Sequence, residues 1–196
     1  MVRIHVSQLI KFMKKVIIIH GFKGAPNSGW KSWLMVELGK KGIWACAPSM
    51  PDSSNPISIE WVKEISRQVE MHKKDQIYLV GHSLGVTAIL RYLEGTKAKN
   101  IKGAVLVSSP VFKSNKKGVA NFFKTPFNYK SIKAKKLKFG VIHGDDDRSV
   151  SFDQGEFLAK ELGSKLVVIR NGGHLNSSAG WKELPQCLAE LARIMA

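Results

Sequence analysis

The sequence has few cysteines and no long hydrophobic run, and both absences restrict what the protein can be. The two cysteines among 196 residues, Cys46 and Cys187, have no Cys-x-x-Cys spacing, which argues against a disulfide framework. We expect buried free thiols and a reducing, cytoplasmic location. No apolar stretch approaches the roughly 20 residues that cross a bilayer, and residues 1–15 lack the pattern of a secretory signal. We therefore expect a soluble protein without a membrane span.

Acidic residues are also scarce, since 15 of them stand against 31 lysines and arginines, for a formal net charge of +16. The imbalance is strongest between residues 95 and 144, which hold twelve lysines and no acid. Such a surface could attract nucleic acid or an anionic membrane. However, lysines offer point charges rather than bidentate contacts, and no nucleic-acid-binding motif accompanies them. We favour a solvated lysine-rich surface, with nucleic-acid association as the less favoured alternative.

Six short apolar runs alternate with segments whose apolar residues recur at helical spacing. The strand candidates are residues 16–19, 43–47, 77–80, 104–107, 137–142 and 166–169. The helix candidates are residues 30–38, 57–69, 84–94, those around 157–162, and 181–191. This alternation predicts the α/β class: a compact, open and mostly parallel sheet of about six strands with helices on both faces.

The connection between the fourth and fifth predicted strands does not fit this alternation. Residues 111–136 mix lysines with aromatic residues, and Pro126 interrupts any long helix. We expect this segment to cross the carboxyl ends of the strands. It would form either a small cap over a site or an irregular connection with one short helix.

The clearest chemical signal is Gly81-His82-Ser83-Leu84-Gly85, which follows an apolar run and precedes a predicted helix. A strand followed by Gly-x-Ser-x-Gly and then by a helix is the arrangement in which a serine on a sharp, strained turn acts as a nucleophile. Glycines stand two residues before and after the serine because a Cβ at either place would approach the neighbouring backbone too closely. Ser83 could instead only cap the helix that follows it.

Two further candidates follow later strands, at the sheet edge where sites form in open parallel sheets. Asp147 follows the fifth predicted strand and His174 the sixth, which gives the chain order Ser, Asp, His of the α/β-hydrolases. His174 can take the proton of Ser83 and return it to the leaving group, while Asp147 orients the imidazole. The backbone N–H groups of Leu84 and of Phe22, in the loop after the first strand, are the expected oxyanion donors.

Each of these assignments has a structural alternative. The run Asp145-Asp146-Asp147 could be a solvated turn or a cation site, although three acids without further oxygen ligands are weak evidence for calcium. Within the run we prefer Asp147 to Asp146 because of its place in the loop that leaves the strand. His174 could be structural, but the two glycines before it let the loop aim the ring. No histidine pair has metal-ligand spacing, so we expect neither a metal nor a cofactor.

With these residues in view, the chain resembles the small α/β-hydrolase family that includes retinoblastoma-binding protein nine, from about Lys15 to the C-terminus. The likeness depends on residues 16–22, 50–52, 78–85, 123–127, 132–134, 144–150 and 172–176. The resemblance implies a compact hydrolase without the large helical lid of many lipases. It also implies Ser83, Asp147 and His174 as the catalytic triad.

The chain departs from the family at two places. Ser151 stands where a proline commonly follows the valine, and residues 1–12 have no family counterpart. We expect residues 1–12 to be an N-terminal extension and residues 13–196 to form a single α/β-hydrolase domain. Neither departure touches the predicted chemistry.

These observations predict a serine hydrolase that cleaves a small acyl ester through an acyl-enzyme. Thioesters, amides and peptides react by the same steps, and the sequence does not separate them. The alternative is a binding or interaction module on a hydrolase scaffold with weak or vestigial activity, because a fold alone does not determine function. Neither the physiological substrate nor the oligomeric state follows from the sequence.

Overall fold

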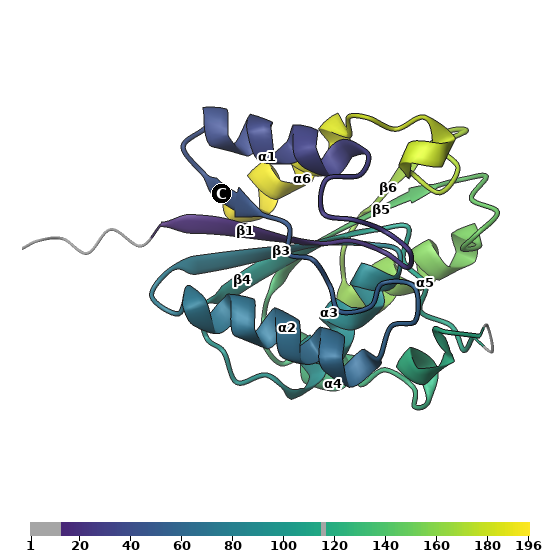
Figure 1. The fold of residues 1–196 in the computed structure, drawn as a ribbon, viewed down its shortest axis with the longest axis horizontal. Helices are drawn as coiled ribbons and strands as arrows, with labels where there is room; N and C mark the ends of the chain where they lie inside the picture. The colour runs from purple at the N-terminus through teal and green to yellow at the C-terminus, as the bar shows by residue number, and fades with distance from the viewer. Residues whose placement is uncertain (1–12, 115–116) are drawn as a thin grey trace, which may run out of the picture.

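A computed structural model describes residues 13–114 and 117–196 (Figure 1). The extension predicted for residues 1–12 lies outside the described residues. Six strands form one sheet in the order β2-β1-β3-β4-β5-β6, and every neighbouring pair is parallel. The strands are β1 Lys14–Ile19, β2 Trp44–Cys46, β3 Gln76–His82, β4 Ile101–Val107, β5 Lys138–Gly144 and β6 Leu166–Ile169. The prediction of a parallel sheet of about six strands is confirmed.

Helices cover both faces of this sheet (Figure 1). Those on one face are α1 Trp30–Lys40 and α6 Pro185–Met195. Those on the other face are α2 Ser58–Met71, α3 Leu84–Gly95, α4 Tyr129–Lys133 and α5 Phe152–Leu162. The result is the three-layer arrangement expected when parallel strands are joined by crossover helices.

Alternate residues of the central strands contribute to the two cores. In β1, Ile17 and Ile19 pack on the side of α2 and α3, whereas Val16 and Ile18 pack on the side of α1 and α6. All four side chains are fully buried. A continuous β-branched run is what a strand needs when both of its faces are covered.

The last helix begins later than the apolar spacing predicts. The spacing predicted a helix over residues 181–191, but α6 starts at Pro185, whose ring suits the first turn of a helix and whose missing N–H costs nothing there. Trp181 lies in the loop before it, where its indole Nε1 donates to the carbonyl of Gly172 over 2.7 Å. This tryptophan therefore supports the loop after β6 and is not part of the helix.

The lysine-rich connection between β4 and β5 is an irregular segment with two short helices. These are a 3₁₀-helix, η1, at Ala120–Phe123, and the five-residue helix α4. Among the described residues it contains no large lid, as the resemblance implied. The segment still contributes to the site, because Val119 and Phe123 line the pocket described below.

Arg91 of α3 holds this connection against α3 through hydrogen bonds. Its Nε donates to the carbonyl of Phe122 over 2.9 Å, and its Nη2 donates to the carbonyl of Thr125. The same guanidinium pairs with Glu94 at 3.0 Å and lies 3.9 Å from the centre of the Phe127 ring. This partly buried guanidinium thus connects residues 122–127 of the segment to α3.

Neither cysteine is in a disulfide. Cys187 belongs to α6 and is fully buried in the core on that face of the sheet, as predicted for a buried thiol. Cys46 is only partly buried, because it lies on the edge strand β2. The two thiols pack on opposite faces of the sheet. In the described part of the chain, no helix is long and apolar enough to cross a membrane.

Candidate active site

Ser83 occupies a strained turn between β3 and α3, with φ 54° and ψ −125°. A positive φ costs a residue with a side chain about 1–2 kcal/mol, so the surrounding packing must impose it. A Cβ on Gly85 would lie 2.2 Å from the carbonyl oxygen of Ile19, and one on Gly81 would lie 2.8 Å from the nitrogen of Val86. Gly85 therefore lets the first turn of α3 pack directly against the end of β1, and Gly81 lets the end of β3 pack against that same turn.

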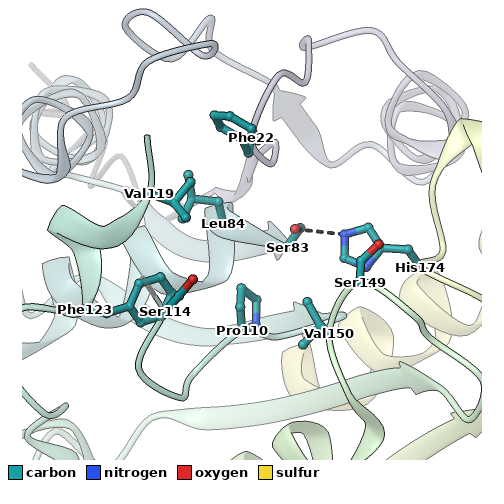
Figure 2. A pocket seen from close by; sticks show the side chains of 10 residues that line it. All are labelled: Phe22, Ser83, Leu84, Pro110, Ser114, Val119, Phe123, Ser149, Val150 and His174. Atoms are coloured by element: carbon teal, nitrogen blue, oxygen red, sulfur yellow. Dashed lines mark hydrogen bonds between the residues drawn. The ribbon is translucent and has the colours of Figure 1, made fainter. Parts of the chain in front are cut away.

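Ser83, His174 and Asp147 form a hydrogen-bonded row. His174 Nε2 lies 2.9 Å from Ser83 Oγ (Figure 2), and His174 Nδ1 lies 2.7 Å from Asp147 Oδ2. Because a carboxylate can only accept, Nδ1 carries the proton and Nε2 is left to accept from the serine hydroxyl. Within the described residues the Ser83 side chain makes no capping bond to α3, so the capping alternative does not describe this serine.

The carboxylate of Asp147 is buried and accepts several hydrogen bonds. Its Oδ1 accepts from the backbone N–H groups of Ser149 and Val150 over 2.8 and 3.0 Å. Burial acts to raise the pKa of Asp147, but the hydrogen bonds from His174 and from these N–H groups outweigh burial and lower the pKa below its usual value. The group is therefore an anion at neutral pH, able to stabilise a cationic imidazole.

The two acids before Asp147 have a different role. Asp145 Oδ1 accepts from the N–H of Asn171 over 2.8 Å, and Asp146 Oδ1 accepts from the N–H of Gly173 over 2.7 Å. Both acids are exposed, and both hold the loop after β6 that carries His174. Among residues 13–114 and 117–196, no group of three or more His, Cys, Asp and Glu side chains is arranged to hold a metal ion.

His82, directly before Ser83, is a supporting residue that sequence reasoning missed. Its Nε2 donates to the main-chain carbonyl of His174 over 2.9 Å, and its buried ring packs edge-on against Trp30. Burial lowers the pKa of His82 to about 3, so the ring is neutral and Nε2 can serve as a stable donor. The only sequence signal for this role is its place beside the serine.

The loop after β1 packs against the same turn. A Cβ on Gly21 would lie 2.9 Å from the Cβ of Ser83, so this backbone can lie against the serine only as glycine. His20 fixes the loop: its Nδ1 donates to the carbonyl of Gly21 over 2.9 Å, and its Nε2 accepts from the N–H of Met50 over 3.2 Å. Phe22 follows in this loop, as the sequence predicted.

A pocket of about 240 Å³ opens at Ser83 and His174. Figure 2 shows these two side chains facing each other, with Leu84 and Val119 on one side of the pocket and Val150 on the other. The remaining lining residues are Phe22, Pro110, Ser114, Phe123 and Ser149. No charged side chain lines it among the described residues. Binding pockets commonly measure about 300–1,000 Å³, so this one suits a small group. Six of its ten lining residues are apolar and the others are three serines and His174, so the lining is mixed but uncharged. We call it the apolar pocket.

Comparisons with known proteins agree with this arrangement. The serine hydrolase family model matches residues 16–193. YdeN of Bacillus subtilis (strain 168) is 31% identical over 175 residues, which cover 88% of this chain and 91% of YdeN. The serine hydrolase RBBP9 of Rattus norvegicus is 25% identical over 170 residues, which cover 84% of this chain and 88% of RBBP9.

Solved structures share the fold over nearly the whole chain. The crystal structure of the ydeN gene product from Bacillus subtilis matches with a TM-score of 0.86 and 29% identity, over 93% of this chain and 99% of that one. Est1E from Butyrivibrio proteoclasticus matches in fold, with a TM-score of 0.72 and 18% identity over 92% and 89% of the two chains. The fold is therefore that of the α/β-hydrolases. The chain belongs to the serine hydrolase family, in the RBBP9-like group that its sequence resembles, and is an enzyme with hydrolase activity.

Proposed function

We propose that the protein is a serine esterase for small acyl esters, with Ser83 as nucleophile, His174 as general base and acid, and Asp147 as the carboxylate that orients the imidazole. The observation that carries the proposal is the row of hydrogen bonds at 2.9 and 2.7 Å from the serine hydroxyl through the imidazole to the carboxylate. A serine hydroxyl is a poor nucleophile at neutral pH, and this geometry supplies the base that it needs.

The reaction has two halves. As Ser83 Oγ attacks the ester carbonyl, its proton passes to His174 Nε2, and the negative oxygen accepts from the backbone N–H groups of Leu84 and Phe22. The bond between the acyl carbon and the alcohol oxygen then breaks, and His174 gives its proton to that oxygen. In the second half a water molecule attacks the acyl-enzyme by the same route, which releases the carboxylic acid and restores the serine.

The size and lining of the apolar pocket support a short, uncharged acyl group. Its volume of about 240 Å³ and its uncharged lining, in which six of ten residues are apolar, suit a few methylene groups. Thioesters and amides pass through the same intermediates, so the same site could process them. We favour esters over amides because an alcohol leaves more readily than an amine; leaving-group ability does not argue against thioesters.

The test uses short p-nitrophenyl esters together with a fluorophosphonate probe. We expect the protein to hydrolyse p-nitrophenyl acetate and to be labelled, and we expect Ser83→Ala to lower kcat by at least about a thousandfold and to abolish labelling. Ser66→Ala, at an exposed position of α2, is the matched control and should behave like the wild type. Equal rates in the wild type and Ser83→Ala would remove this serine from the mechanism. A folded, unlabelled wild type would favour the binding-module alternative.

The neighbouring acids provide a second test of the same mechanism. Asp147→Asn should lower kcat by about 10⁴-fold, because an amide no longer selects the imidazole tautomer with its proton on Nδ1. Asp146→Asn removes the same charge one residue away, where the side-chain oxygen meets only the N–H of Gly173. Its kcat should stay within about tenfold of the wild type, since no contact to the imidazole is lost. Equal losses in the two variants would contradict the role proposed for Asp147.

We also propose a reducing cytoplasm as the place of the reaction. Both thiols are unpaired, and they pack on opposite faces of the sheet, where they cannot reach each other without unfolding. Protein taken from cells and unfolded in the presence of a thiol reagent should show two reactive thiols. A thiol blocked by a mixed disulfide would argue for an oxidising location.

A further inference from the structure

A second cleft, of about 280 Å³, also opens at Ser83 and His174. It extends toward the start of α1 and the 3₁₀-helix η2, Ser177–Ala179, whereas the apolar pocket extends toward the connection after β4. The start of α1 and the loop of η2 are held together, since Trp30 Nε1 donates to the carbonyl of Leu175 over 2.8 Å. In Figure 1 the start of α1 lies beside the loops before α6. We call the cleft lined by these two segments the α1 cleft.

Lys31 lines the α1 cleft and is unlike the other lysines of the protein. Its residue exposure is 4%, and it is the only lysine in the described part of the chain that is buried. Its ammonium lies 5.6 Å from the centre of the Trp30 ring, but it forms no ion pair or hydrogen bond with another described residue. The stem of Lys31 is buried, but its ammonium still contacts solvent in the cleft, where a ligand could replace water as its partner.

The rest of the α1 cleft adds polar groups and the exposed Lys23, but no negative charge. Hydroxyl groups of Ser177 and Ser178 and the side chain of Asn176 line it, and no Asp or Glu among the described residues does so. Burial lowers the pKa of Lys31 to about 8, which leaves most of the group charged at neutral pH. The α1 cleft is therefore lined by two cations, Lys31 and the exposed Lys23, and by no anion among the described residues that could neutralise them.

We propose that the α1 cleft binds the alcohol part of the ester and that Lys31 there pairs with a carboxylate carried by that alcohol. The inference rests on the proposed function, because the two clefts meet at the serine and imidazole assigned to catalysis. The uncharged lining of the apolar pocket takes the acyl part, which leaves the α1 cleft for the alcohol. A carboxylate complements the positive charge of Lys31, and a charge-assisted hydrogen bond is the contact that Lys31 lacks.

The test compares two acetate esters that differ only in charge: γ-acetoxybutyrate and its uncharged amide, γ-acetoxybutyramide. The readout is the ratio of kcat/KM for the anion to kcat/KM for the amide, which cancels any loss of folded enzyme. The wild type should prefer the anion, and Lys31→Met should lower the ratio about 10- to 100-fold, the range of one hydrogen bond to a charged group. Lys31→Arg, which keeps the charge, should keep most of the preference. Lys40→Met removes an exposed lysine from the other end of α1 and should leave the ratio unchanged.

A second readout does not depend on cleavage of these esters. γ-Hydroxybutyrate should inhibit hydrolysis of p-nitrophenyl acetate competitively and better than γ-hydroxybutyramide, and Lys31→Met should remove the difference. A wild type that hydrolyses p-nitrophenyl acetate but shows no preference for the anion, or a ratio that Lys31→Met leaves unchanged, would overturn this inference alone. A folded wild type that neither hydrolyses p-nitrophenyl acetate nor reacts with the fluorophosphonate would overturn the proposed function, and this inference with it.

Discussion

The backbone strain at Ser83 predicts that glycine at this position stabilises the protein relative to alanine. The residue has φ 54° and ψ −125°, a conformation that glycine adopts freely and that any side chain disfavours. Comparing Ser83→Gly with Ser83→Ala isolates this effect, because both variants lose the serine hydroxyl and its hydrogen bond to His174.

The magnitude follows from two opposing contributions. Backbone strain of this kind costs about 1–3 kcal/mol, which glycine relieves and alanine retains. At an ordinary helical position glycine is less stable than alanine by about 1 kcal/mol. We therefore expect Ser83→Gly to be as stable as Ser83→Ala or up to about 2 kcal/mol more stable, a difference of up to about 4–8 °C in Tm for a chain of this size.

The assay is urea and thermal unfolding followed by circular dichroism, with the same pair of substitutions at Ser66 as control. Ser66 is exposed in the interior of α2, so Ser66→Gly should be less stable than Ser66→Ala by about 1 kcal/mol. If glycine costs as much at Ser83 as it does at Ser66, the turn stores no strain and the reasoning is wrong.

Three other predictions follow from contacts described above. Gly85→Ala should destabilise the protein by about 3 kcal/mol in urea unfolding, because its Cβ would meet the carbonyl of Ile19; a loss near zero would show that the strand end can move aside. Arg91→Met should raise KM for p-nitrophenyl esters more than it lowers kcat. The substitution removes the hydrogen bonds that hold the segment with Phe123, a pocket residue, against α3. An unchanged KM would contradict this prediction. Between pH 6.5 and about 3 the unfolded state binds a proton that folded His82 excludes, so stability should fall as the pH falls through this window. His82→Gln should reduce the slope of the unfolding free energy against pH in this window by up to about 1.4 kcal/mol per pH unit. If urea unfolding shows the same slope in the variant, groups other than His82 cause the pH dependence.

The parts of the fold that local chemistry determines could be predicted from the sequence. The strand at residues 16–19 follows from its β-branched run, and the turn at Ser83 follows from the steric need for glycine on both sides. The chain order also indicated that Ser83, Asp147 and His174 would meet at one sheet edge. The structure brings them within hydrogen-bonding distance, while their catalytic roles remain proposals.

The parts that depend on how a loop directs its side chains could not be predicted with the same certainty. Asp146 and Asp147 are chemically identical neighbours, and only the path of the loop after β5 decides which carboxylate points inward to the imidazole. Lys31 lies in the first turn of a helix, where a lysine is normally solvated, and its burial arises from tertiary packing. Trp181 continues the apolar spacing of α6, but the proline at residue 185 sets the start of that helix.

The hydrogen bond from His82 has a consequence for motion. His82 adjoins Ser83 in the chain and also donates to the main-chain carbonyl of His174, which lies 92 positions further on. This bond ties the end of β3 to the loop after β6, so the two segments should move together. We expect slow amide exchange and similar relaxation rates at both ends of the bond, and His82→Ala should make the two segments more mobile.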